Sequence, residues 1–80
     1  SGRRLNVVAQ SEVIKQKLDS LSARELSVME AVLDGYTNRE TADKLGMAVR
    51  TVEIHRANLF TKMGIKGAVE LINLLQILDV

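Results

Sequence analysis

The sequence predicts an all-α fold in which four helices follow a short N-terminal helix. The 80 residues include no proline, and five glycines divide most of the chain into segments of helix length. Apolar residues within these segments recur at intervals of three and four positions, the spacing of one face of an α-helix. Two Ser/Thr-x-x-Glu motifs, which cap helix N-termini, precede two of the expected helices. A chain of this length forms one small domain.

Residues 1–20 are expected to lie outside the main domain, which we place at residues 21–80. Val13, Ile14 and Leu18 predict a short amphipathic linker helix at about 11–19, and residues 1–10 are expected to be a flexible lead-in. Because the chain begins with Ser1-Gly2 instead of methionine, we expect a fragment of a longer protein.

The first helix of the main domain is predicted at about 23–34. Ser22-x-x-Glu25 forms a capping box, and Gly35 supplies the left-handed residue that ends the helix. Leu21 and Leu26 occupy the two positions of a hydrophobic staple. The side chains expected to face inward are Leu26, Met29, Val32 and Leu33.

Three further helices complete the expected order. Thr37-x-x-Glu40 caps a helix that Gly46 stops, and a helix from about 49 or 50 to 63 is closed by Gly64. The last helix is predicted at about 67–78. The side chains expected to face inward are Ala42 and Leu45 in the first of these, Val52, Leu59 and Met63 in the second, with Phe60 at the edge, and Ala68, Leu71, Ile72, Leu75 and Leu78 in the third.

The segment from Thr37 to Arg56 has the pattern of a helix-turn-helix. The turn glycine, Gly46, comes four positions after the small Ala42, and the apolar Val52 follows six positions later. The two helices need small and apolar residues there because they cross closely at the turn. The second helix of such a motif enters the major groove, so the sequence predicts double-stranded DNA as the partner.

The outer face expected for the helix at 49–63 carries side chains able to contact bases. Arg50 can bind guanine or a phosphate, and Ile54 and Ala57 can contact a thymine methyl group. Glu53 can accept a hydrogen bond from cytosine. Alternatively, Glu53 forms an ion pair within the helix, because Arg50 and Arg56 lie three positions on either side of it.

Other polar side chains are expected to contact phosphates. Thr37 and Asn38 lie at a helix N-terminus, where free N–H groups attract anions, and simple capping is the alternative. Lys62 and Lys66 are expected phosphate contacts, with ordinary surface lysines as the alternative. Arg56 falls toward the inward side, so its stem is expected along the core edge and its guanidinium near a phosphate.

The composition fits this function and argues against others. The net charge is only +1, but Arg50, Arg56, Lys62 and Lys66 oppose one acid, Glu53, in the stretch they span. There is no cysteine, and no apolar run reaches the length of a membrane span. We therefore expect a cytoplasmic domain with no metal and no cofactor. The single histidine, His55, is expected to pack at the flank of the core, so no enzymatic role is predicted.

Four groups of residues between Leu21 and Leu71 form one long pattern: Leu21-Ser22-x-Arg24-Glu25, Gly35-x-Thr37-Asn38-x-Glu40-x-Ala42, Thr51-Val52-x-x-His55-x-x-Asn58 and Lys62-Met63-Gly64. In this pattern the chain resembles the LuxR-type helix-turn-helix domain, and most of all the FixJ subgroup of response regulators. The resemblance implies the C-terminal effector domain of a two-component response regulator, preceded by a receiver domain and a linker helix. It also implies base and backbone contacts from Arg50, Thr51, Glu53, Ile54 and Ala57, with Lys62 near the phosphates.

Two positions depart from the family pattern. Ala48 stands where the family usually has a serine or threonine, so an N-cap worth about 1 kcal/mol is missing from the recognition helix. Glu53 stands where the wider family often has lysine, which lowers the non-specific attraction to phosphates. Both departures predict weaker DNA binding by the isolated domain.

The last helix carries more apolar residues than one buried face needs. Val69 and Ile77 fall outside the main stripe, beside Asn73 and Leu74. Members of the LuxR family commonly dimerise through this helix, so these four residues are expected contacts of a homodimer on DNA. The alternative is that the linker segment folds back and covers them.

Other functions remain open. Among DNA-binding domains, the alternatives are a LuxR-type quorum-sensing regulator and the promoter-recognition domain of a sigma-type factor. A different class is a helical dimerisation or protein-interaction module, whose activity would not depend on Arg50 or Lys62.

Overall fold

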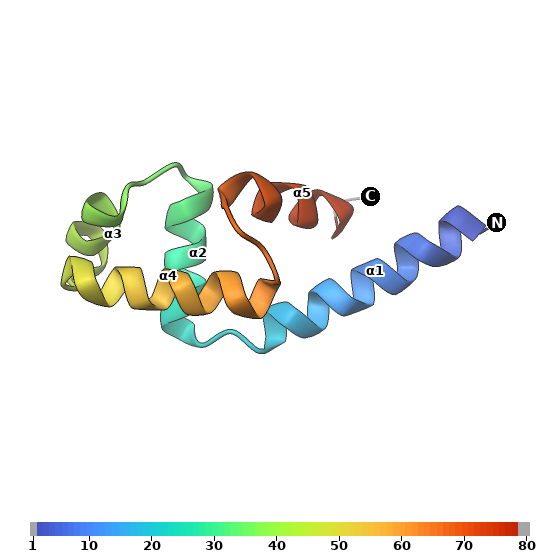
Figure 1. The fold of residues 1–80 in the computed structure, drawn as a ribbon, viewed down its shortest axis with the longest axis horizontal. Helices are drawn as coiled ribbons and strands as arrows, with labels where there is room; N and C mark the ends of the chain where they lie inside the picture. The colour runs from blue at the N-terminus through green and yellow to red at the C-terminus, as the bar shows by residue number, and fades with distance from the viewer. Residues whose placement is uncertain (1, 79–80) are drawn as a thin grey trace.

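The computed structural model describes residues 2–78, and the side chains of residues 10–78. Over these residues the chain forms five helices and no strand, so the predicted all-α fold is confirmed (Figure 1). The helices are α1 (Gly2–Asp19), α2 (Ala23–Leu33), α3 (Asn38–Leu45), α4 (Val49–Met63) and α5 (Ala68–Leu78).

Helix α1 differs from the expectation, because it begins at Gly2 and not at about residue 11. Residues 2–10, expected to be a flexible lead-in, are therefore helical. The physical reason is that no proline or glycine interrupts residues 3–19, and most of these residues are good or neutral helix formers. The N-terminal end of α1 extends past the other helices in Figure 1.

The caps and turns predicted from the sequence are confirmed. Ser22 and Thr37 each accept a hydrogen bond from the backbone N–H three residues later, and each backbone N–H binds the glutamate there, as in a capping box. Gly46 and Gly64 end α3 and α4 with φ of 67° and 68°, a left-handed conformation that glycine adopts without strain.

The core lies where α2, α4 and α5 meet the C-terminal half of α1. The fully buried Leu59 of α4 alone contributes about 2 kcal/mol of hydrophobic stabilisation. The residues that form the core cluster are Ile14, Leu21, Val28, Val32, Leu59, Met63, Ile65 and Leu71.

The inward face predicted for α2 was partly wrong. Val32 is buried and Met29 is half-buried, but Leu26 and Leu33 are exposed, and Val28 and Ala31 are buried in their place. Helix α2 contacts α3, α4 and α5, and small side chains on the contact face let these helices approach closely.

The stripe predicted for α5 also needs one correction. Leu71 is fully buried, and Ala68, Leu75 and Leu78 are half-buried, but Ile72 is 41% exposed. Helices α1 and α2 both contact α5. Ile72 follows Leu71 by one residue, about 100° around the helix, and so lies outside the face that these helices cover.

Candidate functional site

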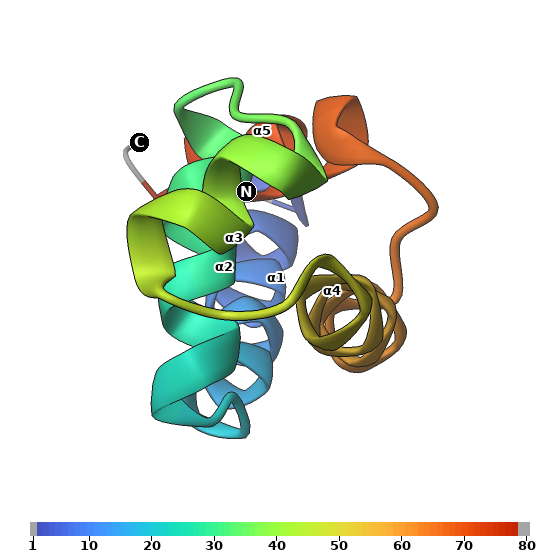
Figure 2. The ribbon, with the colours of Figure 1, turned by 90° about the vertical axis from the view of Figure 1, so that its left-hand side faces the viewer.

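Helices α3 and α4 are joined by a tight turn and contact each other (Figure 2). Ala42 and Val52 are both buried, as expected for the residues where the two helices cross. In the turn, the backbone N–H of Met47 donates to the carbonyl of Ala42 at 3.0 Å, and Gly46 takes the left-handed conformation. The helix-turn-helix geometry predicted from the sequence is present.

Helix α4 presents one face to the core and the opposite face to solvent. Val52, Leu59 and Met63 have no exposed surface, which fixes the rotation of the helix. Ile54 is 48% exposed, so its side chain is accessible to a partner. We call the opposite side the outer face of α4; its residues are Arg50, Glu53, Ile54, Ala57 and Thr61, all exposed as predicted.

At the start of the outer face, Arg50 and Glu53 form an ion pair within the helix. Arg50 Nη1 lies 3.4 Å from Glu53 Oε2, and both side chains are well exposed, so the pair contributes at most about 0.5 kcal/mol. Ala48 is the N-cap and provides no side-chain hydrogen bond, as expected. Thr51 is exposed on the same first turn. The weak pair leaves both charged groups free to exchange this contact for one to a partner.

Arg56 connects α4 to the start of α3. Arg56 is half-buried, its guanidinium carbon lies 5.0 Å from the centre of the Phe60 ring, and Nη1 donates to Oδ1 of Asn38 at 3.5 Å. Arginine can only donate, so Asn38 must turn its carbonyl oxygen toward Arg56. The amide NH₂ of Asn38 then points away from Arg56. His55, next to Arg56, is half-buried as expected of a flanking residue.

Thr37 serves as the N-cap of α3. Its hydroxyl accepts from the backbone N–H of Glu40 at 3.1 Å, and its backbone N–H donates to the Glu40 carboxylate at 2.9 Å. The backbone N–H of Thr37, and after it the Thr37 hydroxyl, lower the pKa of the Glu40 carboxyl group. A hydroxyl can donate as well as accept, so the hydroxyl of Thr37 can also donate to another group.

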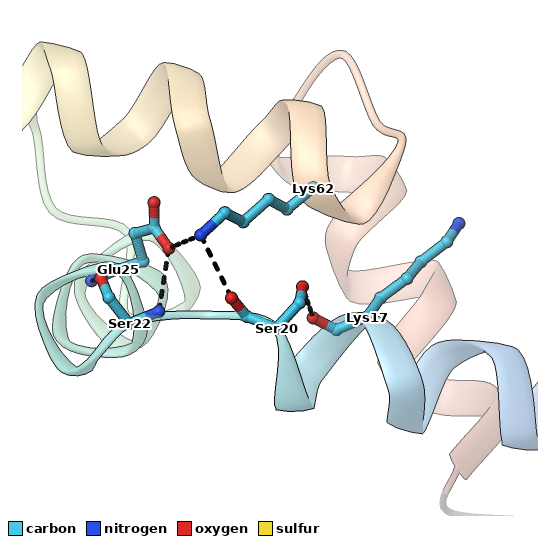
Figure 3. Close-up of polar contacts among 5 residues, drawn as sticks. All are labelled: Lys17, Ser20, Ser22, Glu25 and Lys62. Carbon is cyan, nitrogen blue, oxygen red and sulfur yellow. Dashed lines mark hydrogen bonds and ion pairs between the residues drawn. The ribbon is translucent and has the colours of Figure 1, made fainter.

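Lys62 is not turned to the outer face. Its ammonium donates to Glu25 Oε1 at 2.7 Å and to the carbonyl of Ser20 at 3.1 Å (Figure 3). Glu25 is only 4% exposed, and its carboxylate also accepts from the backbone N–H of Ser22 at 2.9 Å. Lys62 and then this N–H lower the pKa of Glu25 against the opposing effect of burial. The sequence identified the capping box that contains Glu25 and the segment that contains Lys62. It did not predict the ion pair between these two residues, because they are 37 positions apart.

Lys66 is exposed in the connection between α4 and α5. It follows the C-terminal end of α4, whereas Arg50 is in the first turn, so the two are separated by about 20 Å along the helix. The outer face and Lys66 therefore do not form one cluster, although a long partner could contact both.

The four residues expected to form a dimer surface on α5 fall into two groups. Val69 is 69% exposed, and Asn73 is also exposed. Leu74 and Ile77 are half-buried and line a cavity of about 330 Å³ that they share with Val13 and other residues of α1. Helix α1 thus partly covers the second group, as the alternative interpretation expected, and leaves the first group open.

Within residues 2–78, no helix has both the length and the apolar character needed to cross a membrane. The same part of the chain holds no group of three or more histidine or acidic side chains arranged to bind a metal ion.

Comparison with known proteins identifies relatives of this helical arrangement. The family model described as bacterial regulatory proteins, luxR family, matches residues 19–75. Oxygen regulatory protein NreC of Staphylococcus aureus (strain JH9) is 44% identical over 52 residues, which cover 65% of this chain and 24% of NreC. The chain therefore spans about a quarter of the length of this curated relative.

Two solved structures share the fold over nearly the whole chain. Full-length FixJ from B. japonicum superposes with a TM-score of 0.83 at 33% identity, over 95% of this chain and 37% of FixJ. The response regulator StyR superposes with a TM-score of 0.82 at 31% identity, over 94% of this chain and 37% of StyR.

Proposed function

Since the chain belongs to the LuxR family of bacterial regulatory proteins, we propose that it binds double-stranded DNA in a sequence-specific manner, as the effector domain of a two-component response regulator. The observation that carries the proposal is the outer face of α4, whose residues are all exposed while the opposite face is locked into the core. A rigid helix of this kind fits the major groove, with its first turns nearest the bases.

The outer face supplies distinct contacts along α4. Arg50 pairs with a guanine or a phosphate, and Thr51 contacts the backbone at the same turn. Ile54 and Ala57 contact thymine methyl groups, each good base contact being worth about 1–3 kcal/mol of discrimination. When DNA is bound, the Glu53 carboxylate leaves its ion pair with Arg50 and accepts a hydrogen bond from a cytosine amino group. It needs this partner because an unpaired carboxylate near phosphates is repelled.

Phosphate contacts flank the outer face. Asn38 and Thr37 retain donors at the N-terminus of α3, where the helix dipole favours an anion. Arg56 supports Asn38 and adds positive charge beside the backbone. Lys66 contacts the phosphates beyond the C-terminal end of α4, whereas the ammonium of Lys62 is held by Glu25 and the carbonyl of Ser20.

We further propose that two copies bind paired half-sites through α5, with Val69 and Asn73 at the centre and Leu74 and Ile77 at the edge against α1. A two-fold pair would place two recognition helices on one side of the duplex, one helical turn or a multiple of it apart. A receiver domain before α1 would control this assembly, in the bacterial cytoplasm where the chromosome lies. No catalytic role is proposed for the domain.

The experiment that tests the proposal measures fluorescence anisotropy on randomised DNA duplexes at two salt concentrations. The wild-type domain is compared with an Arg50→Ala/Ile54→Ala variant and with Lys15→Ala, an exposed substitution on α1 that serves as control. We expect the wild type and the control to select one sequence with salt-dependent affinity, and the double variant to lose that selection. Selection of the same sequence by all three would exclude α4 as the reading helix.

A second candidate function is a protein-interaction module that works through α5. It is favoured by one observation, the exposure of Val69 and Ile72 on the same helix. The same experiment separates the two, because an interaction module would show no sequence selection at either salt concentration.

A further inference from the structure

The C-terminal ends of α1 and α4 lie close together, and each receives a lysine from the other helix. Lys17 of α1 donates to the carbonyl of Met63, the last residue of α4, at 3.2 Å. Lys62 of α4 donates to the carbonyl of Ser20, the first residue after α1, at 3.1 Å. Carbonyls at a helix C-terminus have no partner within the helix and favour a nearby cation, so both bonds satisfy groups that need them.

The side chains around these two lysine hydrogen bonds pack closely. The half-buried Lys17 lies against the turn that ends α4, where a Cβ built on Gly64 would stand 3.2 Å from its Nζ. Ile14, one turn earlier on α1, belongs to the same buried cluster as Met63. The last two turns of α1 and the last turn of α4 are therefore one packed unit.

A third element joins through Glu25. The Lys62 ammonium is shared between Glu25 and the Ser20 carbonyl, and the Glu25 carboxylate also binds the N-terminus of α2 (Figure 3). Two acceptors from different segments restrict Lys62 more than a single surface ion pair would. Because it is held by these acceptors, the ammonium is directed toward α1 and α2, away from the outer face of α4.

We propose that Lys17 and Lys62 are positioning residues that hold the recognition helix α4 at a defined angle to α1, so that a movement of α1 changes how the outer face meets DNA. This inference rests on the proposed function of α4. A regulatory domain would attach at the N-terminal end of α1. Because the two lysines bond α1 to α4, a movement of that domain would be passed through α1 to α4. Lys62 then acts through the fold and not as a phosphate contact.

The first test requires no DNA. Residual dipolar couplings of the backbone amides report the angle between α1 and α4 in the wild type, in Lys17→Met and Lys62→Met, and in the control Lys15→Met. Methionine keeps the apolar stem and removes the charge, and Lys15 is exposed and pairs with its neighbour Glu12 at 3.8 Å. We expect the control to keep the wild-type angle, the two test variants to lose it, and Lys17→Arg to restore it.

The proposal is overturned if the residual dipolar couplings of Lys17→Met give the same angle between α1 and α4 as those of the wild type. If Lys62→Met fails to fold because Glu25 is left buried without its cation, Lys17→Met decides alone, since Lys17 donates to a neutral carbonyl.

The second test measures affinity for the selected DNA site as a function of salt. A positioning residue far from the phosphates should lower the affinity about 3- to 30-fold. It should leave the slope of log affinity against log salt unchanged, whereas loss of one phosphate contact reduces that slope by about 0.9. A reduced slope for Lys62→Met would overturn its positioning role. If the wild type selects no DNA, the proposed function fails, while the couplings still decide whether the lysines set the helix angle.

Discussion

At the scale of single residues, the most informative contact is the one between Arg56 and Asn38. It joins the two helices of the motif away from their turn, and it orients an amide whose carbonyl is bound and whose NH₂ is left to donate. We therefore propose that Asn38 donates to a phosphate and that Arg56 holds the Asn38 amide in place.

Replacing Asn38 by aspartate separates these two roles. The new carboxylate still accepts from Arg56, as an ion pair, and suits the first turn of α3, so the free energy of unfolding should stay the same or rise. The variant has no amide donor and carries a negative charge toward the phosphates, so DNA affinity should fall about tenfold or more. Urea denaturation and fluorescence anisotropy measure the two effects.

Asn38→Ala is the matched control, because it removes the contact to Arg56 as well as the donor. We expect it to lose both stability and affinity. If Asn38→Asp and the wild type bind DNA with equal affinity, the amide of Asn38 makes no phosphate contact.

Ala48 offers a second prediction at this scale. Its φ of −71° and ψ of 148° are those of an N-cap, but its side chain makes no hydrogen bond to α4. Ala48→Ser should therefore stabilise the domain by about 0.5–1 kcal/mol, seen as a higher urea midpoint. Ala23→Ser is the control, because α2 already has Ser22 as its cap. An equal gain from both substitutions would rule out capping as the cause.

At the scale of the helices, the pairing of Glu25 with Lys62 makes stability depend on pH. The pKa of Glu25 is lower in the folded state than its ordinary value, so the unfolded chain binds a proton first as the pH falls. The stabilisation is therefore fully present above the ordinary pKa and is lost as the pH falls through the lower, folded value.

Glu25→Gln removes this dependence. We expect a loss of about 2 kcal/mol of unfolding free energy near neutral pH, because a buried charge-assisted hydrogen bond is lost. Unfolding in urea at a series of acidic pH values should then show a shallower decline than in the wild type. Glu30→Gln, at an exposed position of α2, should keep the wild-type decline. An equally steep decline in Glu25→Gln would assign the pH dependence to other carboxylates.

The element boundaries were predictable because their signals are local. Capping boxes and left-handed glycines act within three or four residues, and they placed the ends of α2, α3 and α4 within about one residue of the structure. The start of α1 was missed, since nothing in the sequence marks it. The inward face of α2 was partly missed because its apolar residues occupy more than one side, and tertiary packing selects the side that meets α4.

At the scale of the whole molecule, the outer face of α4 was predictable and the lysine contacts were not. The rotation of α4 follows from its own periodicity, which puts Val52, Leu59 and Met63 on one side. The bonds of Lys17 and Lys62 join residues 46 and 42 positions apart and exist only once α1 lies against α4. A lysine near a helix end can bind a phosphate or a carbonyl, and only the arrangement of the whole chain decides between them.

The proposed assembly of two copies on DNA gives the last prediction, which concerns the open part of α5. In a two-fold pair each copy contributes the same residue to the contact, so Val69→Glu would bring two unpaired carboxylates into one interface. We expect the variant to bind a single half-site with wild-type affinity. The extra affinity that the wild type has for a paired site should fall by about 2 kcal/mol or more, roughly 30-fold. Electrophoretic mobility with single and paired half-sites measures both affinities.

The control for this prediction is Gln16→Glu, which adds the same negative charge at an exposed position of α1. Any general repulsion from DNA appears equally in the control, so the difference between the two variants isolates the dimer contact. Because Val69 is 69% exposed, its substitution leaves the core and the outer face of α4 unchanged. Undiminished cooperativity in Val69→Glu would remove this part of α5 from the dimer interface and place the contact between copies elsewhere on the surface.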